Sequence, residues 1–523
     1  MAAPSAATLD TGAALTLALG TEPANWNELS TAGTAGDPGL MTGAVLPSAF
    51  VVQPDYTLAL NQTFLLSATA TRTVPPTVVY RINPKATWSD GVPITWADFQ
   101  YNWEAQSGQA RFTDTGGRPF TPASTLGYSE ITSVAATDDD PDVVTVVFSS
   151  IFPDWRTLFS DLVPAHIATK VGFDTGFTDP VDDVVSGGPF LVEAYVPGRS
   201  LTLVRNARWW GTPASLSAVT FDFVARPLVV ADALGLGELG GAYLAPSAVL
   251  VASLRALPDV KIDLAAGGTW EELEFNQTNR WLKDPVLRQS IFSAVDRPQL
   301  IANTVGSYAQ GITPLDSRVF LPGEPAYRDT SGGTYDHANV AAATAALARA
   351  GYKLAAGGLS RGGQQVSLRI SASPGALHGN EEQYLTTAIG ALGIKVTVVA
   401  GMPVPGSHAY DLAIVDRSTS PALAAADAAV GDPATVGTSN YSGADTPAVD
   451  ALLATAGATT DPTTRAQLYN EADVDLWHSA ESLPLFQLPT LLVYQQKYVG
   501  IVDNPSPAGP TWNLANWGVA ASS

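Results

Sequence analysis

Short runs in which apolar and polar residues alternate dominate the first half of the chain. Period-two alternation of this kind is typical of half-buried β-strands. A helix is predicted from 96 to about 107, because Thr95 is a good N-cap and Asp98 can complete a capping box, and another is predicted to begin at 152. The predicted strands of this half lie at 15–19, 78–82, 130–134, 143–148, 190–195, 200–204 and 219–224.

Segments with strand-like and helix-like patterns alternate in the second half of the chain. Apolar residues at helical spacing and a proline near the start predict one helix over 284–297. The order strand, helix, strand over 366–398 predicts a β-α-β unit, with its helix at 381–393. We therefore expect a mixed α/β protein in which α+β and α/β lobes lie side by side. Further strands are predicted at 270–276, 410–415 and 489–494, and further helices at 336–351, 447–456 and 462–480.

Length and charge narrow the class of protein. A chain of 523 residues is expected to form two or three lobes. Its net charge of -22 argues against a nucleic-acid binder, and against docking on anionic lipid through a basic patch. The chain has no cysteine, which excludes thiol catalysis, disulfides and cysteine-bound metal clusters. No apolar run is long enough to span a bilayer, and we interpret the chain as a mature form whose export signal has been removed.

Nothing in the sequence favours catalysis. The five histidines show no metal-ligand spacing, so we expect neither a metal site nor a cofactor. A G-x-S-x-G match at 358–362 lacks the strand before and the helix after it that a hydrolase elbow needs, so Ser360 is interpreted as a turn residue. Glu271 and Glu272 should point to opposite faces of a strand. The acidic run 138–142 lacks the spacing of a calcium loop and is interpreted as a solvated hairpin turn.

Aromatic side chains are the positive signal. The chain has twelve tryptophans and sixteen tyrosines, and Trp26, Trp270 and Trp512 lie in loops or at strand ends. Aromatic rings give a ligand large contact area at little entropic cost, which suits a cleft between lobes. Interior packing is the alternative, and for most of the rings it is the preferred interpretation.

Several motifs in fixed order resemble one family. The stretch 80–99, with the core W-S-D-G-V-P-I-T, resembles the most recognisable motif of the extracellular solute-binding proteins of family 5. These are the oligopeptide- and dipeptide-binding proteins of bacterial ABC importers. Further similar segments lie at 187–190, 205–210, 275–276, 286–297, 335–352, 392–395, 461–465 and 484–486.

The resemblance implies a Venus-flytrap of two lobes plus an extra domain, with the ligand enclosed at a hinge near 270 and 488. Lobe I would combine 1–45, 180–268 and 489–523, the extra domain would cover 46–179, and lobe III would cover 269–488. The family is exported and usually lipid-anchored through an N-terminal cysteine. We therefore expect an extracytoplasmic, monomeric protein that meets the membrane only through such an anchor.

One departure from the family pattern concerns the ligand. Peptide-binding members commonly place an aspartate after the strand equivalent to 410–415, where it receives the peptide's amino terminus. Here Asp416 is misplaced by a few residues, the usual tryptophan is absent, and Arg417 offers a cation. Arginine is suited to a two-point grip on a carboxylate, so Arg417 is predicted to hold a peptide's C-terminus or another acidic group. A surface salt link between Asp416 and Arg417 is the alternative.

The resulting prediction is a non-enzymatic receptor that delivers peptides to an ABC permease and binds no nucleic acid. Segments 45–50, 155–159 and 162–166 point to an actinobacterial branch of the family. Some lipoproteins of that branch serve the synthesis of cell-wall glycolipids and not transport, so this second function is left open. A non-peptide ligand (a sugar, haem or a metal chelate) is also left open. The predicted ligand contacts are Glu22, Asn25, Trp26, Trp270, Glu271, Asn276, Asp416, Arg417, Ser418, Asn440 and Trp512.

Overall fold

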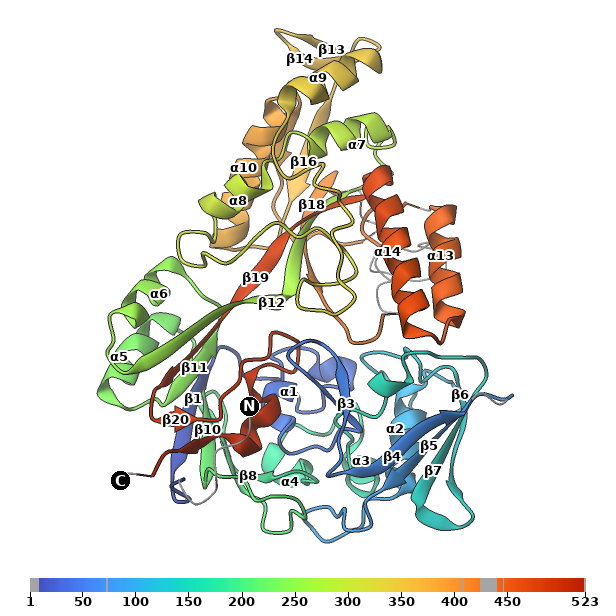
Figure 1. Cartoon of the computed structure of the whole chain (residues 1–523), viewed down its shortest axis with the longest axis vertical. Helices are drawn as coiled ribbons and strands as arrows, with labels where there is room; N and C mark the ends of the chain where they lie inside the picture. The colour runs from blue at the N-terminus through green and yellow to red at the C-terminus, as the bar shows by residue number, and fades with distance from the viewer. Residues whose placement is uncertain are drawn as a thin grey trace. The chain divides into compact units, whose positions relative to one another are not determined.

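The chain folds into two compact units, and it passes from one unit to the other within two long strands (Figure 1). The computed structural model describes residues 9–71, 74–405, 407, 409–423, 440–444 and 446–521. Unit 1 comprises Met1–Leu264 and Thr490–Ser523, and unit 2 comprises Ala265–Pro489. Strands β12 (Val260–Phe275) and β19 (Ser482–Gln495) each contain one boundary between the units.

The main sheet of unit 1 is mixed, in the order β19-β11-β1-β10-β9-β8. Strand β1 (Ala14–Leu19) runs parallel to both β10 (Ala218–Phe223) and β11 (Gly241–Leu244). Its alternating residues Leu15, Leu17 and Leu19 are buried in the core of the unit, as the period-two pattern predicts. The other elements here are β8 (Phe190–Val196), β9 (Ser200–Arg205), α5 (Val230–Leu236), α6 (Ala248–Arg255) and the 3₁₀ turn Pro227–Val229.

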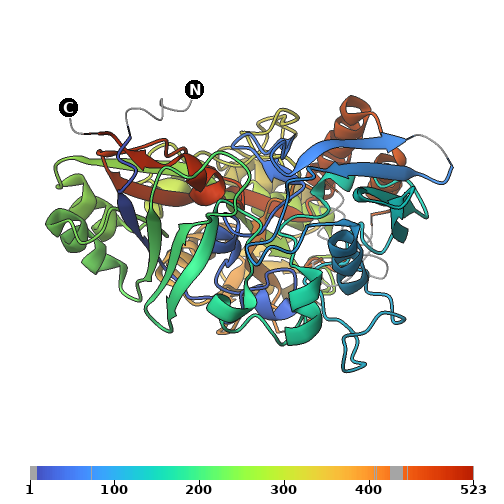
Figure 2. The same ribbon diagram turned by 90° about the horizontal axis from the view of Figure 1, so that it is seen from below.

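A second sheet of unit 1 is antiparallel, in the order β4-β5-β7-β6, and helix α2 (Trp96–Gln106) packs on β6 and β7 (Figures 1 and 2). The predicted capping box is confirmed, because the Thr95 side chain and the Asp98 carboxylate each accept a backbone hydrogen bond. The predicted hairpin turn is also confirmed, with Asp138 and Asp139 at positive φ between the strands. These strands are β4 (Leu65–Thr71), β5 (Thr77–Ile82), β6 (Ile131–Thr137) and β7 (Asp140–Phe148).

Shorter elements complete unit 1. They are α1 (Gly39–Thr42), β2 (Phe50–Val52), β3 (Leu58–Leu60), α3 (Ala165–Val171), α4 (Pro180–Asp183), β20 (Tyr498–Val499), β21 (Gly518–Val519) and the 3₁₀ helices Thr31–Gly33, Trp155–Thr157 and Pro510–Asn516.

The sheet of unit 2 has the order β17-β16-β18-β12-β19. The predicted β-α-β unit is confirmed as β16 (Ser367–Ser371), α10 (Ala376–Gly390) and β17 (Lys395–Val398), with the strands parallel. Strand β18 (Leu412–Ser418) pairs with β16 in parallel and with β12 in antiparallel fashion. Helices α13 (Pro447–Ala458) and α14 (Pro462–Ser479) pack side by side (Figure 1). The remaining elements are α7 (Pro285–Phe292), α8 (Arg297–Asn303), α9 (Val340–Arg349), β13 (Lys353–Ala355), β14 (Gly358–Arg361) and β15 (Gln364–Gln365).

Two local predictions are wrong. The helix predicted over 284–297 forms as α7 but ends at Phe292, five residues early. Arg297 begins the next helix, α8, whose first turn contains Pro298 and is capped by Asp296 through the Gln299 backbone N–H. Ser360 lies in strand β14 rather than in a turn, and its hydroxyl donates to the Lys353 carbonyl. Because β14 pairs with β13 and β15, no helix follows the serine and the hydrolase elbow is absent there.

None of the helices in the described part of the chain combines the length and the apolar character that crossing a membrane requires.

Candidate functional site

Two segments predicted separately as ligand contacts form one antiparallel pair of strands in unit 2. In the β12–β18 ladder Trp270 stands opposite Arg417, Glu271 opposite Asp416, and Thr269 opposite Ser418. Residues that are 145 to 149 positions apart along the chain are thus cross-strand neighbours, with Cβ atoms roughly 5 Å apart. The ladder therefore assembles five of the predicted residues: Trp270, Glu271, Asp416, Arg417 and Ser418.

The two faces of this ladder carry different groups. Glu271 faces α10, where its Oε1 lies 3.0 Å from Nε2 of His378. Glu272 faces the other way, with its Oε2 3.8 Å from Nε of Arg417. The prediction that Glu271 and Glu272 point to opposite faces is confirmed.

On the second face a group that we name the Arg417 cluster comes together: Trp270, Glu272, Glu274, Arg417 and Tyr441. The Arg417 guanidinium donates to the Glu274 carboxylate and lies 5.1 Å from the centre of the Tyr441 ring. The indole N–H of Trp270 donates to Glu272 Oε1 at 2.8 Å. The side chain of Arg417 is 10% exposed and those of Glu272 and Glu274 are 4% exposed. The guanidinium is thus held by the chain's own carboxylates in a nearly buried position, not in a surface salt link with Asp416.

The charges in the Arg417 cluster do not balance. Burial, followed by the charge of Glu272, raises the pKa of Glu274 to about 7, although Arg417 acts to lower it. Burial lowers the pKa of Arg417, but the charges of Glu274 and Glu272 more than offset this and the net shift is upward. One guanidinium therefore serves two carboxylates. The cluster gains a net negative charge as Glu274 ionises near neutral pH.

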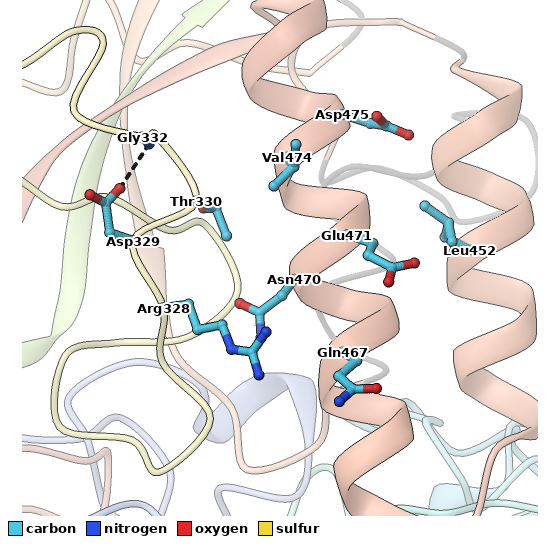
Figure 3. Close-up of a pocket in the computed structure, with 10 residues that line it drawn as sticks. All are labelled: Arg328, Asp329, Thr330, Gly332, Leu452, Gln467, Asn470, Glu471, Val474 and Asp475. Atoms are coloured by element: carbon cyan, nitrogen blue, oxygen red, sulfur yellow. Dashed lines mark hydrogen bonds between the residues drawn. The ribbon is translucent and has the colours of Figure 1, made fainter.

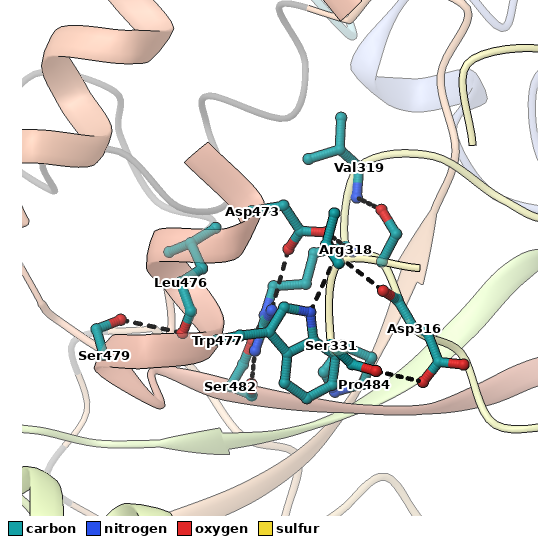
Figure 4. Close-up of polar contacts among 12 residues, drawn as sticks. Asp316, Arg318, Val319, Ser331, Asp473, Leu476, Trp477, Ser479, Ser482 and Pro484 are labelled. Atoms are coloured by element: carbon teal, nitrogen blue, oxygen red, sulfur yellow. Dashed lines mark hydrogen bonds and ion pairs between the residues drawn. The ribbon is translucent and has the colours of Figure 1, made fainter. Parts of the chain in front are cut away.

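Arg318 and Asp473 form a buried ion pair in the same unit (Figure 4). Nη1 of Arg318 is 3.0 Å from Oδ1 of Asp473, and the two side chains are 1% and 0% exposed. Three further donors complete the pair: the Arg318 backbone N–H and the Thr330 hydroxyl bond to Asp473 Oδ2, and Arg318 Nε bonds to Ser482 Oγ. The charge of Arg318 acts, like that of Arg417, against the rise in the pKa of Glu274, so Arg318 and Glu274 interact electrostatically.

Aromatic and charged neighbours enclose this ion pair. The Trp477 ring lies 4.3 Å from the Arg318 guanidinium, and its indole N–H donates to the Thr330 hydroxyl at 3.1 Å. A second buried arginine, Arg297, contacts Asp316 at 2.7 Å and Asp336 at 2.9 Å. These contacts join the segment 315–336 to α14 and β19. Their satisfied geometry indicates a structural rather than a ligand-contacting role.

An open pocket of about 700 Å³ lies beside α14 (Figure 3). Its walls come from the segment 328–332, from α14 and from Leu452 on α13. Thr330 belongs both to this pocket and to the Asp473 network. None of the sequence-predicted contacts lines the pocket. The lining residues are Arg328, Asp329, Thr330, Gly332, Leu452, Gln467, Asn470, Glu471, Val474 and Asp475.

Four predicted contacts lie in unit 1. Trp26 is 1% exposed, and its ring packs edge-on against Tyr195 with centroids 5.4 Å apart. The Glu22 carboxylate accepts hydrogen bonds from the Tyr195 hydroxyl at 2.6 Å and from the Gly198 backbone. Asn25 is buried and donates to the Gly176 carbonyl. The indole N–H of the half-buried Trp512 donates to the Val502 carbonyl at 3.0 Å.

The two remaining predicted contacts hold loops of unit 2. The Asn276 amide donates to the carbonyls of Ser407 and Tyr410. The Asn440 amide donates to Ala444, and its carbonyl accepts from the Ser442 hydroxyl at 2.8 Å. The Asn276 amide therefore ties the end of β12 to backbone groups at 407 and 410, whereas the Asn440 amide satisfies its own turn.

Sequence reasoning missed several charged groups that the fold assembles. Glu272 and Glu274 lie within a strand that was predicted, and their period-two spacing could have placed both on the Arg417 face. His378 and Glu381 stand three residues apart on α10, but the helix was predicted to begin only at 381. Arg318 and Asp473 gave no local signal, because the partners are distant in sequence.

Comparison with known proteins gives a consistent result. A family model described as bacterial extracellular solute-binding proteins, family 5, middle, matches residues 71–448. The chain is 30% identical over 511 residues to the oligopeptide-binding protein OppA of Mycobacterium tuberculosis, covering 92% of this chain and 81% of the relative.

Two further similarities point to other ligands. The solved structure of a periplasmic EDTA-binding protein, EppA, matches with a TM-score of 0.88 and 31% identity, covering 98% of each chain. A protein of Mycobacterium tuberculosis named "Probable monoacyl phosphatidylinositol tetramannoside-binding protein LpqW" is 32% identical over 301 residues. That match covers 56% of this chain and 45% of the relative.

Proposed function

The chain belongs to the bacterial extracellular solute-binding proteins of family 5, a family of non-enzymatic binding proteins, and from this premise we propose that it captures short peptides for an ABC permease. The similarity to an oligopeptide-binding protein over nearly the whole chain supports the peptide as ligand. The observation that carries the proposal is the unbalanced charge of the Arg417 cluster.

A cationic ligand group would balance that charge. Glu272 and Glu274 share the single guanidinium of Arg417, and each carboxylate keeps a small exposed fraction. The free amino terminus of a peptide carries one positive charge and three N–H donors, which match the excess carboxylate. The Trp270 and Tyr441 rings border the same groups and favour a cation electrostatically. In this proposal Arg417 positions the carboxylates rather than gripping a peptide's C-terminus.

The other predicted contacts remain predictions. Trp270 supplies an apolar wall on the Arg417 face, so it is proposed as a ligand contact. Ser418 alternates to the opposite face of the ladder, where its hydroxyl lies 3.2 Å from that of Thr269, and it stays a prediction. A lipid anchor and a monomeric state are likewise proposed from family membership.

A metal–EDTA chelate is the second candidate ligand. The match to an EDTA-binding protein at 31% identity favours it. A chelate of this class carries net negative charge, which the excess carboxylate of the Arg417 cluster opposes. The electrostatics of the cluster therefore favour the peptide.

The affinity for a peptide with a free amino terminus should depend on pH in a bell-shaped manner. Glu274 attracts a cation only after losing its proton, so affinity should rise about 5- to 10-fold from pH 6 to pH 7.5, as a pKa of about 7 requires. Above about pH 8 the peptide's α-amino group loses its own proton and affinity should fall. Isothermal titration calorimetry of one tripeptide across this pH range measures both limbs.

Two controls isolate the group responsible for this pH dependence. In the Glu274→Gln variant the rising limb should disappear while the falling limb stays. An N-acetylated tripeptide should show neither limb. A rising limb that persists in Glu274→Gln would assign the titration to another group.

Native mass spectrometry of the purified chain tests the proposed function itself. We expect co-purified masses that match mixtures of short peptides, released on denaturation and identified by fragmentation. A single metal–polyaminocarboxylate mass would favour the second candidate. A glycolipid mass would favour the cell-wall lipoprotein and contradict delivery of peptides.

A further inference from the structure

Three potential metal ligands meet on the face of β12 opposite the Arg417 cluster. Glu271 reaches this point from β12, and His378 and Glu381 reach it from α10. His378 and Glu381 are three residues apart on one helix, so both side chains project from the same helical face. The sequence alone predicted no metal site because only spacings between histidines were considered.

The three groups are close enough to share one ion. One ligand atom from each residue can be chosen such that all three lie within 4.8 Å of one another. Nε2 of His378 is 3.0 Å from Oε1 of Glu271. Ligand atoms bound to one zinc ion at 2.0–2.2 Å lie about 3–4 Å apart, so small side-chain adjustments bring the set to coordination geometry.

The carboxylates of this group lack hydrogen bonds although both are buried. Glu271 and Glu381 are each 0% exposed. All four of their carboxylate oxygens have no hydrogen-bond partner among the described residues, and the 3.0 Å approach of His378 lies outside hydrogen-bond geometry. Buried carboxylates in proteins are normally paired, hydrogen-bonded or bound to metal.

Two fully buried carboxyl groups thus converge with one imidazole, and their oxygens are left without hydrogen-bond donors among the described residues. An ion bound between the three side chains would supply the missing partner to these oxygens.

We propose that Glu271, His378 and Glu381 form a binding site for one divalent transition-metal ion of the zinc class. An imidazole nitrogen with two carboxylates is a donor set that suits Zn²⁺ and related ions better than Ca²⁺ or Mg²⁺, which prefer oxygen alone. Two carboxylates neutralise the charge of the ion, and three protein ligands leave one position open.

The ion would enter from the side of Asp416. The Asp416 side chain is 47% exposed and its Oδ1 lies 3.6 Å from Nε2 of His378, whose side chain is 14% exposed. Asp416 therefore links the buried ligands to solvent and adds a negative charge at the entrance. Once bound, the ion would fasten α10 to β12, which contains one of the unit boundaries. The site faces away from the Arg417 cluster, so it does not rest on the peptide proposal.

Isothermal titration of the full chain with zinc chloride, after dialysis against a chelator, tests the site. We expect one ion per chain, and a thermal midpoint that rises with zinc. Glu381→Gln and His378→Gln should each weaken zinc binding at least ~10-fold. Matched controls are Glu324→Gln, a half-buried acid elsewhere in unit 2, and His337→Gln, an exposed histidine that lies 3.3 Å from Asp296; both should bind zinc as the wild type does.

Cobalt(II) supplies a readout that does not depend on the stability of the variants. Visible absorption bands of a low-symmetry, four- or five-coordinate cobalt site should appear with wild-type protein and both controls, and be absent with folded His378→Gln. Wild-type protein that binds no zinc would overturn the proposal, as would equal zinc affinity in folded His378→Gln. In that case the two glutamates form a carboxyl pair that shares a proton.

Discussion

Replacing Asp473 with asparagine is expected to lower the free energy of unfolding of unit 2 by about 3–5 kcal/mol. The side chains of Asp473 and Arg318 are almost completely buried and 3.0 Å apart. Asparagine keeps the shape but removes the charge, which leaves the Arg318 guanidinium uncompensated in the interior. It also weakens the hydrogen bonds that Asp473 accepts from Thr330 and from the Arg318 backbone. Urea denaturation followed by circular dichroism measures the loss.

Two comparisons separate this effect from a general sensitivity of the unit. The double variant Arg318→Met with Asp473→Leu removes both charges and should recover much of the stability, because apolar side chains often replace a buried ion pair at little cost. Arg361→Met breaks the exposed ion pair with Asp284 and should leave the denaturation midpoint close to that of the wild type. An Asp473→Asn protein as stable as the wild type would show that the pair is not held as the structure has it.

Replacing Glu274 with glutamine should weaken the binding of a tripeptide with a free amino terminus by about 100-fold. The substitution keeps the size of the side chain but removes the excess negative charge of the Arg417 cluster. Truncating one partner of a buried, hydrogen-bonded charge pair costs about 2–5 kcal/mol, which corresponds to roughly 30-fold or more in affinity. Calorimetric titration at pH 7.5 measures the change.

Chemical and positional controls accompany the Glu274 variant. The N-acetylated tripeptide has no ammonium group, so it should bind the wild type weakly and bind Glu274→Gln with similar affinity. Asp416→Asn removes an acid from the neighbouring strand on the opposite face and should leave tripeptide affinity within about two-fold. Equal losses for the free and the acetylated peptide would mean that Glu274 supports the fold rather than the ammonium.

Elements specified by neighbouring residues were predictable from the sequence. The capping box of α2 depends on Thr95 and Asp98, three positions apart, and it forms as expected. The β-α-β order of β16, α10 and β17 follows from a change of hydrophobic period. The family resemblance, and with it the fold class, rests on such local motifs in a fixed order.

Features that depend on distant partners were not predictable from local patterns. Arg417 was singled out, but its partner Glu274 was not, because Glu274 comes from a strand more than a hundred residues earlier. The Glu271, His378 and Glu381 group depends on α10 packing against β12, and its helix begins before His378 rather than after it. The end of α7 was not predicted because the apolar pattern continues past it. The next helix, α8, begins instead at the cap formed by Asp296.

A crystal structure of the full chain with a bound tripeptide tests the central claim most directly, through the contacts of the tripeptide with residues of unit 2. The account predicts that the ligand's ammonium nitrogen lies about 2.7–3.2 Å from a carboxylate oxygen of Glu272 or Glu274, with Arg417 still bound to Glu274. A tripeptide whose ammonium pairs elsewhere, or whose carboxylate occupies the Arg417 guanidinium in place of Glu274, would contradict it.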